Sequence, residues 1–443
     1  MASSFPLFSI VIPTRNRAHL LPRALSSALN QQFDDYEIVV VANHCQDNTR
    51  EQVKKMANSR VRYIETNETL SMPNNWEFAW NQAKGKYITY LADDDALVPS
   101  ALKYLAENAL EGNPEVVAWE DATYYYPDWN DANLQNILLM FTTGTSLIDD
   151  LGTSELRKQL ADFTFSWNAP IPKMLNCILQ RDFFEDWRKR LGTLFYPTSP
   201  DYSLAWIVAH ICSSYRLLRR PLTVRGVSDT SIGSNSGLGP QVKEFLKEFG
   251  KFDFFAKTKL NIPIAYNYLA DTFLRINPML LENSIQPEPI DPKQFALALA
   301  KQLHESQPLL ENWENHVKEY LDHIQSIFPD LYDQINMILS HPFDKKEGQE
   351  SLRDMHARTR QMALEYLPNL EIALKKYSGD LQAALGSLAL LDEILPDSNW
   401  SYLYLFGEKL DSHDVYTMST HVDRYYNLLC KVKKIYELSQ LQE

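Results

Sequence analysis

Three consecutive carboxylates, Asp93, Asp94 and Asp95, directly follow the apolar run 87–91. Like charges this close raise one another's pKa, so the three side chains need a positive partner to stay ionised. Mg²⁺ or Mn²⁺ would be such a partner, because these hard cations prefer carboxylate oxygens and often bridge to substrate phosphates. Aspartate is also common at helix N-termini, where it caps the backbone and meets the helix dipole. The cluster alone does not decide between these two readings.

The elements that must position these carboxylates alternate between strand and helix. Between residues 8 and 125, short β-branched runs are separated by segments with helical spacing. This order predicts an α/β fold with a mainly parallel sheet flanked by helices, and ligands beyond the C-terminal strand ends. The expected strands are 8–12, 36–41, 61–65, 87–91 and 115–119, and the expected helices are 18–31, 48–58, 74–84 and 99–110.

The second half of the chain changes character after Pro240. Strand signals almost vanish, and long segments such as 307–328, 350–376 and 380–394 carry helical spacing. Residues 1–240 are therefore expected to form one domain and 241–443 an all-α region, with a sub-boundary near the proline-rich stretch 284–292. Within the first domain we expect strands at 175–179 and 215–225, helices at 182–190 and 202–212, and a mobile Gly/Ser loop at 226–239.

The composition indicates a folded protein that does not bind polyanions. The chain has 443 residues, and 43 Lys and Arg against 57 Asp and Glu give a formal net charge of −14. Nucleic-acid binding depends on clustered basic residues, so no nucleic-acid partner is expected. No apolar run reaches transmembrane length, the N-terminus lacks a secretory signal pattern, and the four cysteines are scattered. These features predict a cytoplasmic protein without a transmembrane segment.

Four segments and the acidic cluster together resemble the inverting family 2 glycosyltransferases, which have the GT-A fold. The resemblance covers about residues 8–230. Its carriers, in the family's order and spacing, are 9–17 (SIVIPTRNR), 41–49 (VANHCQDNT), 67–76 and 83–88 (AKGKYI), followed by Asp93–Asp95.

The resemblance implies a role for each residue of the acidic cluster. Such enzymes hold there the metal that bridges the donor's diphosphate, which makes Asp94 the central ligand and Asp95 a further ligand or orienting group. Asp93 would lie near the ribose. The Mn²⁺ or Mg²⁺ would neutralise the leaving nucleoside diphosphate.

The donor nucleotide is expected at the loop after the first strand. The resemblance implies base and ribose contacts from Pro13, Thr14, Arg15, Asn16 and Arg17, with the arginines adding positive charge near phosphate. The same residues also read as an ordinary turn and cap.

The second strand exit departs from the family pattern. The family commonly has an Asp here that recognises uracil, whereas this chain has Ala42 and Asn43. Asn43 can still bond a base edge, but with a different set of donors and acceptors. A UDP-sugar remains the favoured donor, although Ala42 weakens that assignment. Asn75, within 67–76, is also assigned to donor binding.

An inverting transfer needs a general base that deprotonates the acceptor hydroxyl during its attack. The family places an Asp or Glu at the start of a helix after the acceptor-side strand, and Asp201 matches that position. Asp201 is also a plausible helix cap. Glu120 and Asp121 are the fallback pair for the base and are further candidates for acceptor contacts.

Aromatic residues are dense on the expected acceptor side. They could form an acceptor pocket, because the apolar faces of sugars pack on aromatic rings, or they could simply pack on the core. Trp167 is the aromatic candidate for acceptor binding. The loop 226–239 could close over the donor and exclude water, or could be a linker. The aromatic set comprises Tyr124, Tyr125, Tyr126, Trp129, Phe163, Phe165 and Trp167.

The sequence therefore predicts a metal-dependent inverting glycosyltransferase that moves a sugar from a nucleotide-diphosphate donor to a hydroxyl of a glycan or small molecule. The alternative is a degenerate GT-A module that binds sugar nucleotide or glycan without turnover and serves as an interaction protein. The C-terminal helices carry no catalytic motif, and a homo-oligomer or protein partner there stays open.

Overall fold

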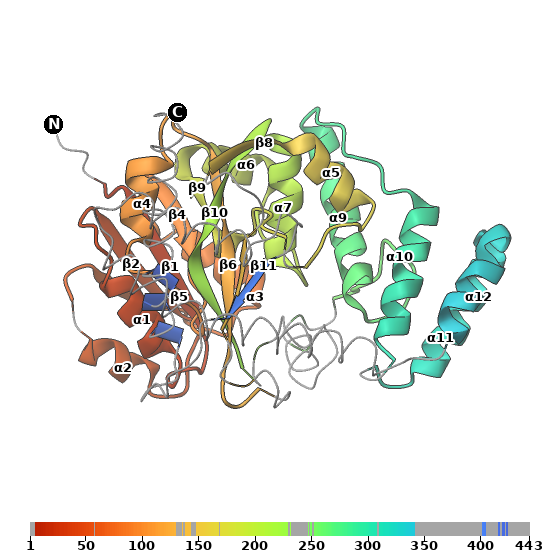
Figure 1. Cartoon of the computed structure of the whole chain (residues 1–443), viewed down its shortest axis with the longest axis horizontal. Coiled ribbons are helices and arrows are strands. Elements are labelled where there is room, and N and C mark those ends of the chain that lie inside the picture. Colours follow the sequence, from red (N-terminus) through yellow and green to blue (C-terminus); the bar gives the residue numbers. More distant parts are fainter. Residues whose placement is uncertain are drawn as a thin grey trace, which may run out of the picture.

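The computed structural model describes most of residues 5–341, with gaps of which 232–246 is the longest, and beyond them 401–404 and part of 415–423. Figure 1 shows a sheet with its helices, followed along the chain by α9 (Ala265–Glu282), which lies beside the sheet domain, and then by α10 (Pro292–Glu305), α11 (Trp313–Ile327) and α12 (Tyr332–Ser340), which lie further from the sheet. No helix in the described part of the chain has both the length and the apolarity to cross a bilayer.

The strands form one mixed sheet, whose main path runs in the order β11-β7-β6-β9-β4-β1-β2-β3. The pairs β1–β2, β2–β3 and β1–β4 are parallel, whereas β9 runs antiparallel to β4 and β6, and β7 runs antiparallel to β6. β10 lies parallel to β6 and also pairs with β5 and β8. The strands are β1 (Phe8–Thr14), β2 (Tyr36–Ala42), β3 (Val61–Glu65), β4 (Tyr87–Tyr90), β5 (Ala96–Leu97), β6 (Val116–Tyr125), β7 (Leu138–Thr142), β8 (Ile148–Gly152), β9 (Cys177–Gln180), β10 (Ser214–Val227) and β11 (Ser401–Tyr404).

This arrangement confirms the predicted fold class, a mainly parallel sheet flanked by helices. The C-terminal ends of β1, β2, β4, β6 and β10 lie at one edge of the sheet, as the pairing directions require. The helices are α1 (Leu21–Leu29), α2 (Thr49–Lys55), α3 (Met72–Trp80), α4 (Ala101–Asn108), α5 (Thr153–Ala161), η1 (Met174–Asn176), α6 (Arg181–Leu191), α7 (Pro200–Ile211), α9 (Ala265–Glu282), α10 (Pro292–Glu305), α11 (Trp313–Ile327), η3 (Pro329–Leu331) and α12 (Tyr332–Ser340).

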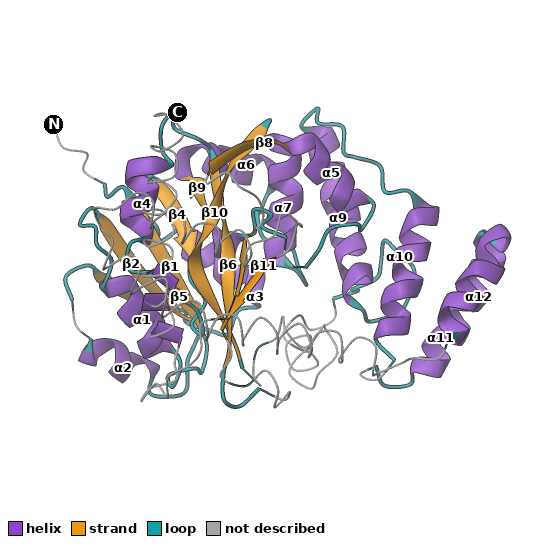
Figure 2. Ribbon diagram, viewed as in Figure 1, coloured by secondary structure: helices purple, strands orange, loops and turns teal. Residues whose placement is uncertain are grey.

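Alternating strand residues divide the core into two layers. Ile10 and Ile38 pack with α1 and α4, whereas their neighbours Val11 and Val39 pack with α3, α6 and α7. All four side chains are fully buried, as the period of two in a strand predicts for a sheet covered on both faces. Figure 2 shows the strands gathered between these helices.

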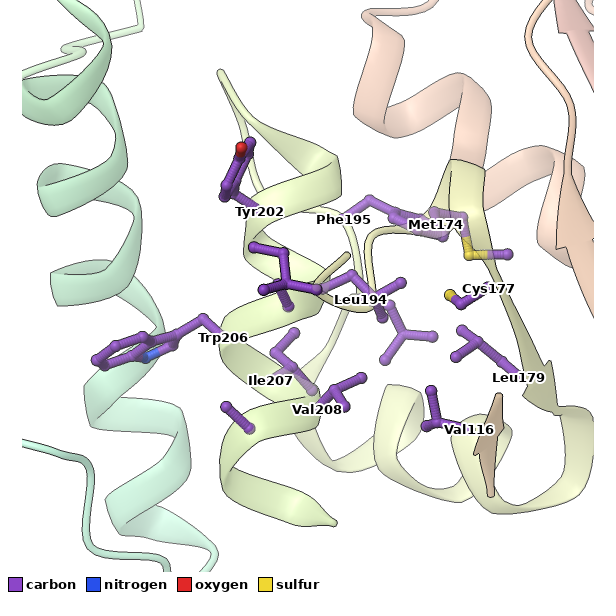
Figure 3. Packing of buried hydrophobic residues seen from close by; sticks show 14 of the residues in the cluster. Val116, Met174, Cys177, Leu179, Leu194, Phe195, Tyr202, Trp206, Ile207 and Val208 are labelled. Carbon is purple, nitrogen blue, oxygen red and sulfur yellow. The ribbon is translucent and has the colours of Figure 1, made fainter. Parts of the chain in front are cut away.

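Helix α7, which carries Asp201, is fixed by the deeper of these layers. Leu204, Ile207 and Val208 are fully buried and pack with residues of β9 and the 194–195 segment (Figure 3). On its other side Trp206 stacks on Phe273 of α9, with ring centroids 4.3 Å apart. A helix buried on both sides gives its N-terminal carboxylate a fixed position.

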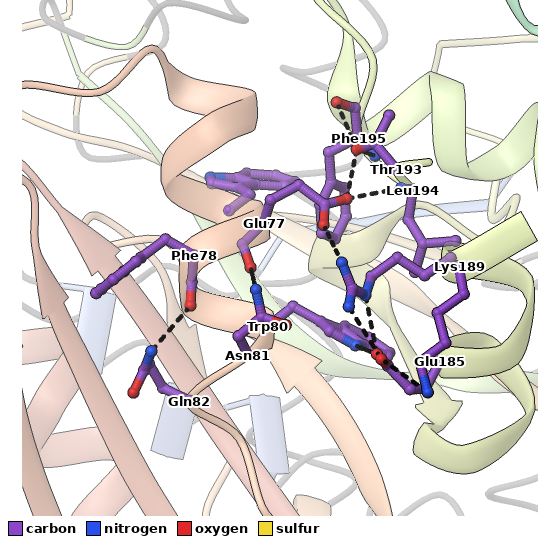
Figure 4. Close-up of polar contacts among 12 residues, drawn as sticks. Glu77, Phe78, Trp80, Asn81, Gln82, Glu185, Lys189, Thr193, Leu194 and Phe195 are labelled. Atoms are coloured by element: carbon purple, nitrogen blue, oxygen red, sulfur yellow. Dashed lines mark hydrogen bonds and ion pairs between the residues drawn. The ribbon is translucent and has the colours of Figure 1, made fainter. Parts of the chain in front are cut away.

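A polar network joins α3 to α6 on the same face of the sheet. Glu77 accepts hydrogen bonds from Thr193 Oγ1 and from the backbone N–H of Leu194, the latter at 2.7 Å. Arg188 lies between Glu77 and Glu185, and Trp80 Nε1 donates to Glu185 at 3.0 Å (Figure 4). The network therefore fixes the position of the segment that connects α6 to α7.

The strands and helices predicted between residues 8 and 125 are confirmed to within about four residues, except that the strand predicted at 115–119 continues to Tyr125 as β6. The later expectations also hold for β9, α6, α7 and β10. The prediction missed β5, which has two residues, and β8, whose sequence IDDLG alternates too weakly to read as a strand. Gly226 lies inside β10, so the expected loop 226–239 begins later, and most of it lies outside the described residues.

The region after residue 240 is helical from α9 to α12, and the stretch 284–292 connects α9 to α10. One correction concerns β11, because this strand pairs antiparallel with β7 and so 241–443 is not entirely α-helical. The alternating sequence SYLY suits an edge strand, and β7 offers it an open edge. The predicted helices 350–376 and 380–394 lie outside the described residues.

Residues near the C-terminus also reach the core of the sheet domain. Val415 and Val422 are fully buried in the layer that contains α1 and α4. Arg220 Nη2 donates to Asp423 Oδ1 at 2.8 Å and to Ser100 Oγ at 3.0 Å, and Arg220 and Asp423 are both buried. The predicted boundary at residue 240 stays a prediction, but helical residues beyond it contribute to both layers of the core.

Candidate active site

Residues at the end of β1 and in the loop after it contact Asp93 and Asp94, the first two residues of the acidic cluster. Asp93 accepts hydrogen bonds from Thr14 Oγ1 at 2.7 Å and from Arg17 Nη1 at 2.9 Å. The same Nη1 lies 3.1 Å from Asp94 Oδ2, so one guanidinium pairs with both carboxylates. Burial raises the pKa of Asp93, and Arg17 opposes that shift. Burial alone would lower the pKa of Arg17, but the two carboxylates outweigh it and the pKa is raised.

The end of β10 holds the acidic cluster from the other side. Ser231 Oγ donates to Asp94 Oδ2 at 3.0 Å, and the backbone N–H of Gly226 donates to Asp95 Oδ1 at 2.8 Å. A Cβ on Gly226 would lie 1.9 Å from the carbonyl oxygen of Asp94, so only glycine fits there. Burial, reinforced by Asp94, raises the pKa of Asp95 well above its usual range.

Asp94 is the carboxylate best placed to bind a cation. Its hydrogen bonds from described residues both reach Oδ2, which leaves Oδ1 for a ligand. Across the described part of the chain, no three His, Cys, Asp or Glu side chains converge as a complete metal site. The residues fit a cation that takes one carboxylate and completes its shell with phosphate oxygens and water, as Mg²⁺ often does. Asp95 is already bonded to Gly226 and fits an orienting role.

The predicted donor residues divide into two groups. Thr14 and Arg17 contact the acidic cluster directly, and Asn16, with a φ of 54°, accepts at Oδ1 from the backbone of Gln46 at 2.8 Å. Pro13, near the end of β1, and Arg15, in the loop that follows, are both half-buried. The loop therefore joins the exits of β1 and β2, as expected for a ligand site at this sheet edge.

Asn43 and Asn75 have different surroundings from each other. The amide of Asn43 accepts from Leu70 N at 2.9 Å and donates to Leu70 O at 2.8 Å, which clamps the 66–70 loop. A base contact by Asn43 would have to replace these bonds. Asn75 is buried in α3, and its Oδ1 has no hydrogen-bond partner among the described residues. An unsatisfied buried acceptor of this kind is costly unless a ligand donates to it.

Four charged side chains from four elements gather beside the acidic cluster. They are Asp121 on β6, Lys173 before η1, Asp201 in the first turn of α7 and Arg225 on β10. Burial raises the pKa of Asp121 to about 6, against the opposing effects of Lys173 and Arg225. Burial also raises the pKa of Asp201 and lowers that of Lys173.

Glu120 and Asp121 are both predicted from the sequence as fallback candidates for the general base. In the structure they face opposite sides of β6, because consecutive residues of a strand point to opposite faces. Glu120 lies 3.8 Å from Arg219 Nη1 and is buried there. Asp121 lies among Lys173 and Arg225. Of the two fallback residues, only Asp121 stands in the charged group that contains Asp201.

Most of the aromatic residues expected near the acceptor pack in the core. Only Trp167 among them is exposed, at 39%, and its ring contacts Tyr202 of α7. The buried members of the set are Tyr124, Tyr126, Trp129, Phe163 and Phe165.

Lys173, Arg225 and Ser231 are residues of the site that the sequence does not predict, and Gly226 is predicted there only as part of a loop. Arg225 could have been found, because it closes a strand predicted to end at the ligand-binding edge. Lys173 and Ser231 lie in irregular segments whose position depends on the tertiary fold, and no local pattern marks them.

The described fold and site agree with one protein family. Residues 9–188 match the family model described as glycosyl transferase family 2. This segment, about two fifths of the chain, is similar to the family 2 glycosyl transferases.

Several bacterial enzymes are similar over this segment. The chain is 36% identical over 114 residues to the GalNAc(5)-diNAcBac-PP-undecaprenol beta-1,3-glucosyltransferase of Campylobacter jejuni, a match that covers 25% of this chain and 37% of the relative. It is 27% identical over 107 residues to the UDP-Glc:alpha-D-GlcNAc-diphosphoundecaprenol beta-1,3-glucosyltransferase WfgD of Escherichia coli, covering 24% and 42%. The chain thus spans less than two thirds of these relatives. A crystal structure of Staphylococcus aureus TarS 1-349 with UDP-GlcNAc is 15% identical, with a TM-score of 0.43 over 77% of this chain and 95% of that one.

Proposed function

We propose that the protein is a metal-dependent, inverting glycosyltransferase that transfers a sugar from a nucleotide-diphosphate donor to a hydroxyl acceptor in glycan biosynthesis. One observation carries the proposal. The backbone N–H of Gly226 in β10 donates to Asp95 Oδ1 at 2.8 Å, and the adjacent Arg225 opposes the rise that burial causes in the pKa of Asp121 and of Asp201. The acidic cluster and the candidate base therefore border the same end of β10, as a donor site and an acceptor site must.

In this mechanism Asp201 takes the proton from the acceptor hydroxyl as its oxygen attacks the anomeric carbon. A new C–O bond forms on one face while the bond to the diphosphate breaks on the other, and the nucleoside diphosphate leaves with the electron pair. The fixed position of α7 aims the carboxylate, and burial raises the pKa of Asp201 and so makes it a stronger base.

Asp94 would hold Mn²⁺ or Mg²⁺, which would supply charge neutralisation to the departing diphosphate. Arg17 adds positive charge beside the same carboxylate. Ser231 and Gly226 fix the positions of Asp94 and Asp95 through their hydrogen bonds. Thr14 orients Asp93 through its hydroxyl.

The relatives' names support the finer assignments. Two of them are named as beta-1,3-glucosyltransferases, and one name includes UDP-Glc. A β-linked product from an α-linked nucleotide sugar fits inversion, and a UDP-sugar is the favoured donor here despite Ala42. A cytoplasmic location is part of the same proposal.

The test is a thermal-shift and titration series with UDP-, GDP-, dTDP- and CMP-sugars, each with Mn²⁺, with Mg²⁺ and with chelator. Selective binding raises apparent stability, so we expect a metal-dependent shift with one nucleotide class. Binding that ignores chelator would contradict the metal assignment. Donor binding without turnover on any glycan would favour the non-catalytic module.

A further inference from the structure

A buried ion pair joins the C-terminal part of the chain to strand β10. Arg220 Nη2 donates to Asp423 Oδ1 at 2.8 Å, and the two side chains are only 3% and 7% exposed. The hydroxyl of Ser100, the residue before α4, donates to the same carboxylate oxygen and accepts from Arg220 at 3.0 Å. The guanidinium also lies over the ring of Tyr104 in α4, 4.7 Å from its centre. One carboxylate therefore contacts both β10 and the start of α4.

Arg220 lies where β10 has no regular pairing with β6. Strand β10 advances from Leu218 to Thr223 while β6 advances only from Trp119 to Asp121, so the register between the two strands shifts there. A bulge of this kind disrupts the ladder of backbone hydrogen bonds. The position of β10 at this point therefore depends on contacts other than its pairing with β6.

The acidic cluster lies on the same two segments. Strand β5, which directly follows Asp95, pairs antiparallel with β10. At one end of this short ladder the backbone N–H of Val98 donates to the carbonyl oxygen of Leu222 at 2.9 Å. At the other end the backbone N–H of Gly226 donates to Asp95 Oδ1 at 2.8 Å. The ion pair is thus at one end of the ladder and the acidic cluster at the other.

We propose that Asp423 is a positioning residue for the donor site. Through Arg220 and Ser100 it holds β10 against the segment that leads from β5 into α4, and this contact fixes the carboxylates of Asp94 and Asp95 for the donor. The inference rests on the proposed function, because it concerns the donor site of that reaction. It makes the C-terminal part of the chain a point from which donor affinity can be changed.

Apolar packing alone does not account for the ion pair. Val415 and Val422 come from the same part of the chain and are fully buried in the layer that contains α1 and α4. These contacts would anchor it without any charge. A buried carboxylate is costly unless it is paired, and apolar residues in place of a buried ion pair are often at least as stable. What the pair adds is a defined geometry between Asp423 and Arg220.

The experiment compares Asp423→Asn with Asp271→Asn in the full chain. Asp271 is the matched control, because it is a carboxylate of α9 that is 2% exposed and pairs with Arg275. Both variants should lose stability. Only Asp423→Asn should weaken the binding of UDP-glucose with Mn²⁺, by about tenfold. Asp423→Glu keeps the charge and should restore part of that loss.

Hydrogen exchange of the ligand-free protein gives a second readout. In Asp423→Asn the backbone amides of residues 94–98 and 222–226 should exchange faster, because the ladder between β5 and β10 opens more often. In Asp271→Asn the same amides should exchange as in the unchanged chain.

Ser100→Ala is a milder second variant that decides the question if Asp423→Asn does not fold. It keeps the ion pair and removes only the hydroxyl that both charged groups contact. The Ser100 side chain makes no capping hydrogen bond to α4, so the helix itself is not weakened. We expect the same two changes, in donor affinity and in exchange, at smaller size.

Exchange over 94–98 and 222–226 that stays unchanged in these variants would overturn the proposal. A donor affinity that is unchanged where exchange has risen would overturn it as well. Failure of the proposed function is a different result, because the unchanged chain would then bind no nucleotide sugar at all. In that case the exchange of the acidic segment alone decides whether Asp423 positions it.

Discussion

The two halves of the candidate site satisfy their charges in different ways. On the donor side, Asp93, Asp94 and Asp95 all receive hydrogen bonds from the protein, through Arg17, Gly226 and other neighbours. On the acceptor side, buried atoms of Asp121 and Arg225 lack partners among the described residues. The acidic cluster is held in place by the protein's own hydrogen bonds, whereas the charged group on the acceptor side keeps buried atoms that have no partner among the described residues.

This difference separates residues that build the site from residues that perform its chemistry. Removing a hydrogen bond that holds the acidic cluster should disturb folding and binding together, whereas a donor-side substitution that keeps those hydrogen bonds should change binding alone. Removing an acceptor-side group should change turnover or acceptor affinity and leave the fold intact. Four substitutions test this division, in order of decreasing expected effect.

Asp201→Asn should lower the transfer rate by about 10³-fold, within the usual range for loss of a general base. Donor affinity should be unchanged, because the acidic cluster is intact. Single-turnover transfer and donor titration measure the two quantities separately. A fully active Asp201→Asn variant would assign the role of general base to Asp121 instead. Asp121→Asn should then show the loss of transfer rate.

Asp94→Asn should reduce metal-dependent donor affinity by about 10- to 100-fold, since it weakens the proposed cation site. The amide can still accept from Ser231, so folding should be largely kept. Donor titration with and without chelator tests this result. A donor affinity that is unchanged by the substitution and insensitive to chelator would contradict the assignment of a metal site to Asp94.

Gly226→Ala should destabilise the protein by about 1–3 kcal/mol, because the new methyl group has no room beside the Asp94 carbonyl. Gly152→Ala in β8 is a matched control, since the nearest atom to its Cβ would be 4.0 Å away. Denaturant unfolding compares the two variants. Equal stability of the two variants would mean that the backbone at Asp94 can move away from residue 226 more easily than these distances indicate.

Lys173→Met should move the acidic limb of the kcat/KM profile to higher pH by about one unit. The reason is that Lys173 opposes the effect of burial on the pKa of Asp201, so its loss raises that pKa further. Less of the base is then ionised at a given acidic pH. Lys173→Arg should restore the profile, whereas an unmoved limb would show that Lys173 does not act on the base.

The sequence predicts the donor half better than the acceptor half, and the reason is physical. Asp93 and Thr14 follow regular buried strands, whose alternation and spacing are local properties of the chain. The parallel order of those strands then requires their ends to meet. A reader of the sequence can therefore place both residues at one edge of the sheet.

The acceptor half depends on contacts that no local pattern encodes. Lys173 reaches its place because Asn176 Nδ2 donates to the carbonyl oxygens of Trp119 and Ile171 at 3.0 and 3.1 Å, which fixes the turn before β9. Tyr266 reaches Trp167 from a helix a hundred residues further on, as the fold alone decides. Roles for Asp201 and Trp167 could be proposed from sequence, but not their neighbours.

The buried pair of Arg220 and Asp423 has a consequence for the order of events during synthesis. The two residues are 203 positions apart. At ribosomal rates of roughly 5–20 residues per second, Arg220 leaves the ribosome about 10–40 s before its partner. During most of that interval strands β1 to β10 have been made, but β11, Asp423, Val415 and Val422 have not. Until residues 415–423 are made, Arg220 lacks its carboxylate partner Asp423, and the apolar surface that Val415 and Val422 cover stays exposed.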